Sequence, residues 1–194
     1  IGVGPGGRLQ ANLRNVRVTI YSTTLEYRLL DPDLVQVTAG QVPVDGAKDL
    51  DLAVTKPGTW LLKLVPGQGS CEVRVANRLV AEVATAQDPL ALFTSPITRC
   101  FVVPAGATQF RLGFREGGPD ETAPFQITSP TGRVALDYNG NGSGAELPGE
   151  VRPDEAGQLW TMRIEPRQDM QCWLAGEVNP YLSTAPERAL VDRR

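Results

Sequence analysis

The chain has 194 residues, of which 20 are glycine, 16 are proline and none is histidine, and its formal net charge is -3. A small charge of mixed sign excludes the clustered basic face that nucleic-acid binding needs. The absence of histidine excludes Ser-His-Asp and Cys-His catalysis, and no apolar run reaches the roughly 18 residues that span a bilayer.

The N-terminal stretch, residues 1–9, reads as a linker. Four glycines and a proline fall within Ile1–Gly7, and that density predicts a linker and not a strand. Because the first residue is Ile1 and not Met, we also expect a processed form or a piece of a larger protein.

Further along, short runs rich in Val, Leu, Ile and Thr alternate with turn clusters such as Pro104-Ala105-Gly106. Apolar residues never recur at helical spacing for three turns. In chain order, the expected strands are residues 16–20, 25–30, 60–65, 73–75, 101–103, 110–114 and 160–165. The pattern predicts an all-β protein.

The two halves of the sequence resemble each other at a nearly constant offset. Trp60 and Trp160 lie 100 positions apart, and each stands in a run that ends in proline. Other landmarks keep a similar spacing: Pro32 with Pro130, Cys71 with Cys172, Thr85 with Thr184. We therefore predict two tandem homologous antiparallel β-sandwich modules, Ig-like or jelly-roll, over residues 1–94 and 95–194.

Alternation within the repeat predicts which side chains are buried. Residues Trp60, Leu62 and Leu64 share one face, as do Trp160, Met162 and Ile164, and we expect both sets in cores. The opposite face of the first copy holds Leu61, Lys63 and Val65. Its apolar members predict contact with a neighbouring module or another chain.

Several segments resemble the bacterial pre-peptidase C-terminal module and related jelly-roll accessory domains. The resemblance rests on Val103-Pro104-Ala105-Gly106, Ser129-Pro130-Thr131-Gly132 and Ala156-Gly157-Gln158-Leu159-Trp160. It covers most of residues 97–175 and, more weakly, residues 28–76. It implies a non-catalytic module of a secreted, periplasmic or cell-surface bacterial protein. The first copy lacks a Val-Pro-Ala-Gly equivalent before Leu29.

Trp173 is the candidate ligand-binding residue. If Cys172 and Leu174 face inward, Trp173 faces outward, where an exposed indole could stack on a sugar ring. Tyr138 and Tyr181 would join it on that surface. The alternative is that Trp173 is buried between modules or against a partner domain.

Asp137, Asn139 and Asn141 match the first half of a calcium-binding loop, with Gly142 at the turn. The closing glutamate is missing, because the twelfth position is Pro148. The segment therefore predicts either a structural calcium site, with these three residues as ligands, or a hairpin loop whose Asn-Gly pairs take positive φ.

Cys100 lies on the first strand of the second copy and Cys172 near the last. First and last strands often neighbour in sandwiches, so a Cys100–Cys172 disulfide is one interpretation and two buried thiols the other.

Three functions remain open. The first is a non-catalytic accessory module pair of a secreted or cell-surface bacterial protein, with polysaccharide or the other domains of a larger protein as its partners. The second is a structural or adhesive subunit that self-assembles through the face around Leu61 and Val65. The third is a histidine-free glycosidase or lyase that uses two of the many carboxylates.

Overall fold

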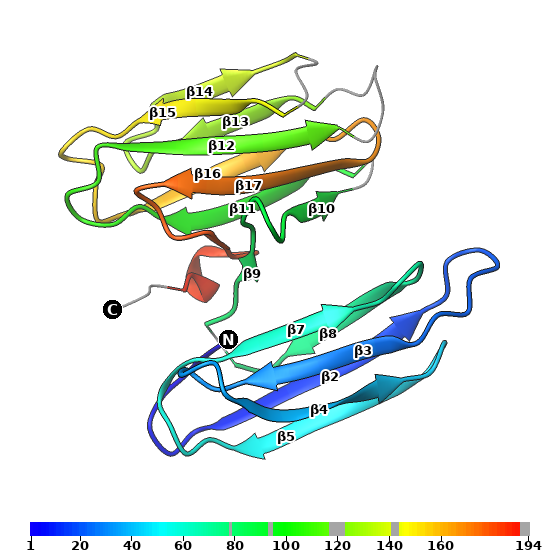
Figure 1. Ribbon diagram of the computed structural model, residues 1–194. Helices are drawn as coiled ribbons and strands as arrows, with labels where there is room; N and C mark the ends of the chain where they lie inside the picture. Colours follow the sequence, from blue (N-terminus) through cyan, green and yellow to red (C-terminus); the bar gives the residue numbers. More distant parts are fainter. Residues whose placement is uncertain (78, 93–94, 117–122, 141–143, 191–194) are drawn as a thin grey trace. The chain divides into compact units, whose positions relative to one another are not determined.

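A computed structural model describes residues 1–77, 79–92, 95–116, 123–140 and 144–190, and the described chain is all-β (Figure 1). Every strand pairing is antiparallel, and the one described helix is a short 3-10 turn, Pro186–Arg188. The all-β prediction is confirmed. The chain divides into two compact units, Ile1–Val80 and Ala81–Arg194, each with its own hydrophobic core.

The first unit packs two three-stranded sheets around one core. Its strands are β1 (Gly2–Val3), β2 (Arg8–Val16), β3 (Leu25–Leu30), β4 (Gln36–Val42), β5 (Ala47–Ala53), β6 (Gly58–Thr59), β7 (Leu61–Val65) and β8 (Ser70–Val75). The sheet orders are β5-β2-β8 and β4-β3-β7. Alternation sets the buried face: Leu9 and Leu13 of β2 are fully buried, and the residues between them that face outward are polar.

The second unit packs two four-stranded sheets in the same way. Its strands are β9 (Glu82–Val83), β10 (Leu90–Leu92), β11 (Ile97–Val102), β12 (Gln109–Glu116), β13 (Phe125–Thr128), β14 (Val134–Tyr138), β15 (Glu146–Glu150), β16 (Leu159–Ile164), β17 (Met170–Gly176) and β18 (Tyr181–Leu182). The sheet orders are β10-β17-β12-β15 and β11-β16-β13-β14.

Six strands have the same order and the same partners in both units. The triplets β5-β2-β8 and β4-β3-β7 correspond to β15-β12-β17 and β14-β13-β16. Even the irregularities agree, because a register shift follows Leu29 in one unit and Ile127 in the other. The turn after each shift needs a positive φ, which Leu34 supplies at 63° and Gly132 at 84°.

Both repeat tryptophans lie in cores, as predicted: Trp60 is 3% exposed and Trp160 is fully buried. The predicted strand over residues 16–20 does not form, because β2 ends at Val16, and Ile20 is 87% exposed.

The linker prediction for residues 1–9 is wrong. Ile1 and Val3 are buried, and β1 pairs Val3 with Gly58. The second unit has the same arrangement, since the amide of Val103 bonds the carbonyl of Gln158. Val3-Gly4-Pro5-Gly6 is therefore the first unit's counterpart of Val103-Pro104-Ala105-Gly106, and its glycines shape the turn after a short strand.

The structure divides the chain at Val80 and not at the predicted boundary between residues 94 and 95. The segment between these points belongs to the second unit. Its strand β9 pairs with β18 and its strand β10 pairs with β17, so this segment contributes to the second sandwich.

The strand pairing also corrects the alignment of β8 with β17 that the sequence suggests. Leu13 of β2 lies opposite Val73, whereas its counterpart Phe114 of β12 lies opposite Cys172. Val73 is therefore the counterpart of Cys172, and Cys71 that of Met170. The equal spacing of Cys71 and Cys172 in the sequence does not reflect equal positions in the fold.

Candidate functional site

Trp173 faces away from the core, as expected, but it is only 8% exposed. It stands directly opposite Gly113 of β12, and a Cβ atom at Gly113 would lie 2.0 Å from its Cε2. The ring therefore lies over the space that glycine leaves, and its Nε1 donates a hydrogen bond to Glu146 Oε1 at 3.3 Å. The prediction that Trp173 is an exposed platform for stacking on sugars is wrong.

The two tyrosines do not share a surface with Trp173. Tyr138 is half-buried on β14, in the opposite sheet, and its ring lies 5.0 Å from that of Phe114. Tyr181 is half-buried on β18, where it pairs with Val83. The three residues predicted to form one ligand site thus lie on three different sheets.

The calcium prediction rests in part on Asn141, which lies outside the described residues. Asp137 is exposed near the end of β14, opposite Gln126, and Asn139 is exposed just beyond the strand. Among residues 1–77, 79–92, 95–116, 123–140 and 144–190, no three His, Cys, Asp or Glu side chains gather as a metal site would require. The described part of the loop adds no support for calcium.

The cysteines are thiols and form no disulfide. Cys100 is 4% exposed and Cys172 is fully buried, while Cys71 is only half-buried. Burial raises the pKa of Cys172 to about 12, so its thiolate is strongly disfavoured. Cys71 is the most accessible thiol of the three.

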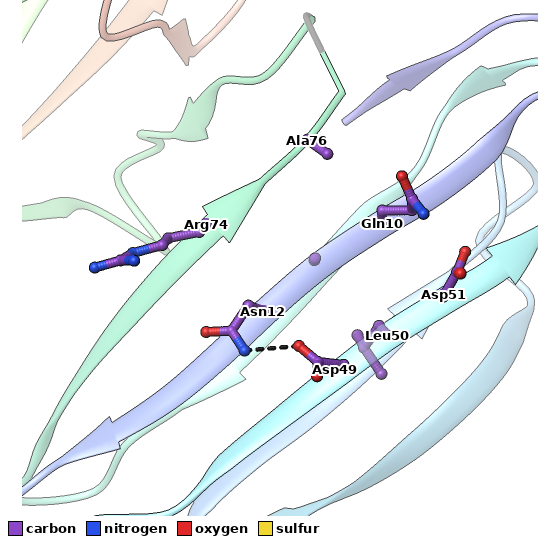
Figure 2. A pocket seen from close by; sticks show the side chains of 8 residues that line it. Gln10, Asn12, Asp49, Leu50, Asp51, Arg74 and Ala76 are labelled. Atoms are coloured by element: carbon purple, nitrogen blue, oxygen red, sulfur yellow. Dashed lines mark hydrogen bonds between the residues drawn. The ribbon is translucent and has the colours of Figure 1, made fainter.

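A shallow polar hollow of about 460 Å³ lies on the outer face of β5-β2-β8 (Figure 2). Its carboxylates are already engaged: Asn12 Nδ2 donates to Asp49 Oδ1 at 2.7 Å, and Arg8 Nε donates to Asp51 Oδ1 at 2.8 Å. The hydrogen bond from Arg8 lowers the pKa of Asp51. These contacts are those of a solvated sheet face, with no group held ready for proton transfer.

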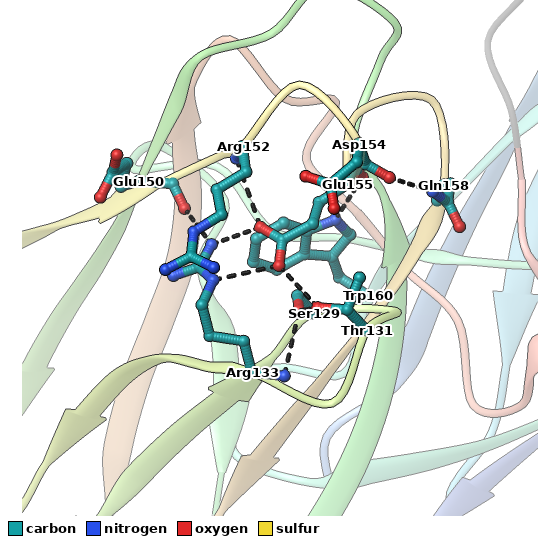
Figure 3. A network of polar contacts seen from close by, with 9 residues as sticks. All are labelled: Ser129, Thr131, Arg133, Glu150, Arg152, Asp154, Glu155, Gln158 and Trp160. Atoms are coloured by element: carbon teal, nitrogen blue, oxygen red, sulfur yellow. Dashed lines mark hydrogen bonds and ion pairs between the residues drawn. The ribbon is translucent and has the colours of Figure 1, made fainter.

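The most buried carboxylate, Glu155, is fully enclosed in the second unit (Figure 3). Its Oε1 accepts hydrogen bonds from Thr131 Oγ1 at 2.8 Å and from Arg133 Nε at 3.0 Å. Its Oε2 is paired with the second guanidinium nitrogen of Arg133 and accepts from the Arg152 amide at 3.3 Å. The bond from Arg133, above all, holds the pKa of Glu155 well below its usual range.

This network is a structural anchor. The guanidinium of Arg133 lies 5.9 Å from the centre of the Trp160 ring, and Trp160 Nε1 donates to the Glu155 carbonyl at 3.0 Å. The first unit has an equivalent pair of contacts with opposite charges. Trp60 Nε1 donates a hydrogen bond to the carbonyl of Lys56, and the ammonium of Lys56 lies 2.8 Å from Asp31 Oδ2. With every oxygen of the carboxylate bonded, Glu155 is not available as a catalytic acid or base.

The outer face of β7 holds charged as well as apolar side chains. Val65 is 46% exposed and Leu61 is half-buried, but Lys63 lies between them. Glu26 and Arg28 of β3 line the same hollow as Lys63 and Val65. This face is mixed in character, so the self-assembly surface expected around Leu61 and Val65 is interrupted by charge.

A clearer feature is the side of the first unit where β7 and β8 end their sheets. In the second unit, β16 lies between β11 and β13, and β17 lies between β10 and β12. In the first unit, as far as the described residues extend, β7 pairs only with β3 and β8 only with β2. We call this side, formed by Leu62, Leu64, Cys71 and Val73, the open side of the first unit.

Apolar side chains at the open side are less buried than their counterparts. Leu62, Leu64 and Cys71 are half-buried, and Val73 is 39% exposed. Their counterparts, in the same order, are Met162, Ile164, Met170 and Cys172. Of these, Met170 is 4% exposed and the other three are fully buried. The difference follows from β10 and β11, which cover the second unit at this place.

Within the described residues, the backbone groups of Leu62 and Leu64 have no strand beside them at the open side. Trp60 exchanges two hydrogen bonds of 2.8 Å with Ile1, through its amide and its carbonyl. Because backbone direction alternates along an antiparallel strand, the groups of Leu62 and Leu64 point the same way as those of Trp60. They face the free edge of β7, beyond the end of β1.

Comparisons with known proteins leave the family open. No family model matches the chain, and no curated protein matches it. Among solved structures, it is similar to the VP2 subviral particle of infectious bursal disease virus, with a TM-score of 0.23 and 9% sequence identity. That match covers 94% of this chain, which spans 58% of the viral one.

Proposed function

We propose that this chain is a non-catalytic pair of β-sandwich modules that serves as an accessory part of a secreted, periplasmic or cell-surface protein. The observation that carries the proposal is that each unit has its own hydrophobic core, while the carboxylates of the polar hollow and of the buried network already accept hydrogen bonds. These carboxylates stabilise the modules and are not free for proton transfer.

The burial pattern disfavours polysaccharide binding at the predicted site. Stacking on a sugar ring needs an exposed aromatic face, and Trp173, Tyr138 and Tyr181 are buried or half-buried. This favours the spacer or stabilising role of an accessory module over the glycan-binding role.

A non-catalytic role agrees with the state of the charged groups. Asp51 and Glu155, the carboxylates of the hollow and of the buried network, already hold hydrogen bonds from arginine. The resemblance to pre-peptidase C-terminal modules fits an accessory part of a secreted, periplasmic or cell-surface protein. In that setting, the second unit serves as a self-contained spacer.

Assays on a panel of polysaccharides test this function. We expect the purified chain neither to cleave the polysaccharides nor to be retained by them in pull-downs. Cleavage of any member of the panel would count against the non-catalytic role, and specific retention by one of them would count against the spacer role.

A further inference from the structure

We propose that the first unit pairs with a second copy of this chain through β4, so that one sheet of each copy joins the other edge to edge around a two-fold axis. Within the described residues, β4 ends its sheet on the side of β3 opposite β7. Its counterpart β14 ends a sheet in the same way, so this edge is a feature that both units share. The association goes beyond the proposed accessory role and does not depend on it.

The strand β4 lacks the features that protect comparable edges of this chain from further pairing. Its seven residues, Gln36–Val42, include no charged side chain and no proline. The counterpart β14 carries Asp137 where β4 carries Ala39, because each lies opposite the matching residue of its middle strand. Of the other edge strands, β5 carries Lys48 and β15 carries Pro148. Since charge and proline on an edge oppose strand addition, β4 is the edge best suited to it.

The turn before β4 adds exposed apolar side chains to this edge. Leu34 is 62% exposed, Val35 is 58% exposed and Val37 is 49% exposed. In the second unit, Gly132 and Arg133 stand at the positions of Leu34 and Val35. Leu34 also has a φ of 63°, a conformation that is costly for any residue but glycine. The first unit thus keeps a leucine exposed at a strained position, which is typical of a contact surface.

The direction of the backbone groups determines which residues of β4 can pair. The amide of Asp31 donates a hydrogen bond to the carbonyl of Val35 at 2.9 Å, so the backbone groups of Asp31 point toward the chain of β4. By alternation along β3, those of Tyr27 point the same way, and its partner Gly40 points back toward β3. The amide and the carbonyl of Ala39 therefore point toward the free edge.

A second copy fits this edge in a register centred on Ala39. When Ala39 lies opposite Ala39 of the other copy, Val37 lies opposite Gln41, and the backbone groups of all these residues point across the interface. The two-fold axis then keeps the outer faces of both sheets on the same side. The same register brings the exposed Leu34 of each copy near Pro43 of the other, so the apolar strip of one copy covers that of its partner.

Charges near the two ends of this interface are already neutralised within each copy. At one end Lys56 pairs with Asp31 and Asp33, and at the other end Arg17 pairs with Asp45. Two copies can therefore approach without bringing unpaired like charges together. This balance favours a second copy of the chain over a strongly charged partner as the occupant of the edge.

Disulfide crosslinking tests the register on the intact chain, with Cys71→Ser to remove the half-buried native thiol. Residues that pair in an antiparallel sheet by two hydrogen bonds have Cα atoms about 5.5 Å apart, a separation that suits a disulfide. With oxidised glutathione as the oxidant, we expect Ala39→Cys to form crosslinked dimers about tenfold faster than Val37→Cys, which lies opposite Gln41. A mixture of Val37→Cys with Gln41→Cys should crosslink as readily as Ala39→Cys.

The variant Ala39→Asp, which copies Asp137 of the second unit, tests the same surface without a thiol. In light scattering at high concentration, the wild type should have twice the monomer mass. Ala39→Asp should have the monomer mass, because its two carboxylates would face each other across the interface. Val134→Asp, at an exposed position of β14, is the matched control and should stay dimeric. Circular dichroism checks that both variants are folded.

A wild type that stays monomeric at high concentration overturns the proposal. A folded Ala39→Asp variant that remains dimeric overturns it too, because another surface then holds the copies together. Equal crosslinking by Ala39→Cys and Val37→Cys, each tested alone, overturns the two-fold register. None of these results bears on the accessory role, which the polysaccharide assays test separately.

Discussion

Replacing Glu155 by glutamine tests whether the buried ion pair anchors the second unit. The change keeps the shape of the side chain but removes the charge that faces Arg133, whose side chain is 19% exposed. Breaking one partner of a buried pair costs about 3–5 kcal/mol, and the remaining amide oxygen places our expectation near the lower end, at about 3 kcal/mol. For a unit of this size, the melting temperature should fall by about 10 °C.

The first unit supplies a matched control. Lys56→Gln breaks the equivalent pair, but the Lys56 side chain is 47% exposed, and Asp31 also accepts hydrogen bonds from the amides of Asp33 and Val35. We expect a clearly smaller loss of stability than in Glu155→Gln, because water screens this exposed pair. Urea unfolding followed by amide hydrogen exchange, read separately in each unit, measures both effects. Equal losses in the two variants, or none in Glu155→Gln, would refute the anchoring role.

The same pair makes a prediction about acid. The pKa of Glu155 is lower in the folded state than in the unfolded chain. Its contribution to stability is therefore fully present above the unfolded value, about 4.3, and is lost as the pH falls below it toward the folded value. Glu155→Gln should lack this component of acid sensitivity. A variant with the same acid profile as the wild type would show that other groups control it.

Three further predictions concern packing. Gly113→Ala should destabilise the second unit by about 2 kcal/mol in urea titrations, because the new methyl group meets the Trp173 ring; no loss would mean that the ring lies elsewhere. In the wild type, iodoacetamide should modify Cys71 well before the buried thiols, and equal rates would contradict the burial. Met162→Ala should cost about 3 kcal/mol and Leu62→Ala about half of that, a ranking that equal unfolding midpoints would overturn.

Much of the fold could be predicted from a few residues of the sequence. Trp60 and Trp160, with the alternating apolar residues that follow them, indicated strand, core face and repeat together. That inference worked because side-chain direction in a strand depends only on local geometry. The turn at Leu34 and Gly132 was harder to match, since the two residues share a backbone conformation and no side-chain chemistry.

The structure of the N-terminal residues depends on strand pairing that lies outside the local sequence. Glycine and proline near Ile1 indicate a turn, and they do form one. The two apolar residues before this turn, Ile1 and Val3, are buried because β1 pairs with β6. Such pairing joins residues more than 50 positions apart and leaves no periodic signal in a strand of two residues. The counterpart at Val103 was the signal that could have identified it.

Exposure of Trp173 could not be predicted from its own strand. Alternation correctly placed the ring on the outer face, but its burial depends on Gly113 in the strand beside it. A glycine inside a strand often marks a close approach by a neighbouring group. Glu155 stands in a polar, turn-rich segment that predicts a solvated surface, and this prediction is wrong because Thr131 and Arg133, more than 20 residues earlier, enclose its carboxylate.

Within the described residues, β7 ends its sheet, whereas β16 lies between β11 and β13. Amide hydrogen exchange can be compared at Leu62 and Leu64 in the first unit and at Met162 and Ile164 in the second. We expect the amides of Leu62 and Leu64 to exchange rapidly in the native chain, while those of Met162 and Ile164 exchange only when the second unit unfolds. Equally slow exchange at all four positions would show that β7 is covered like β16.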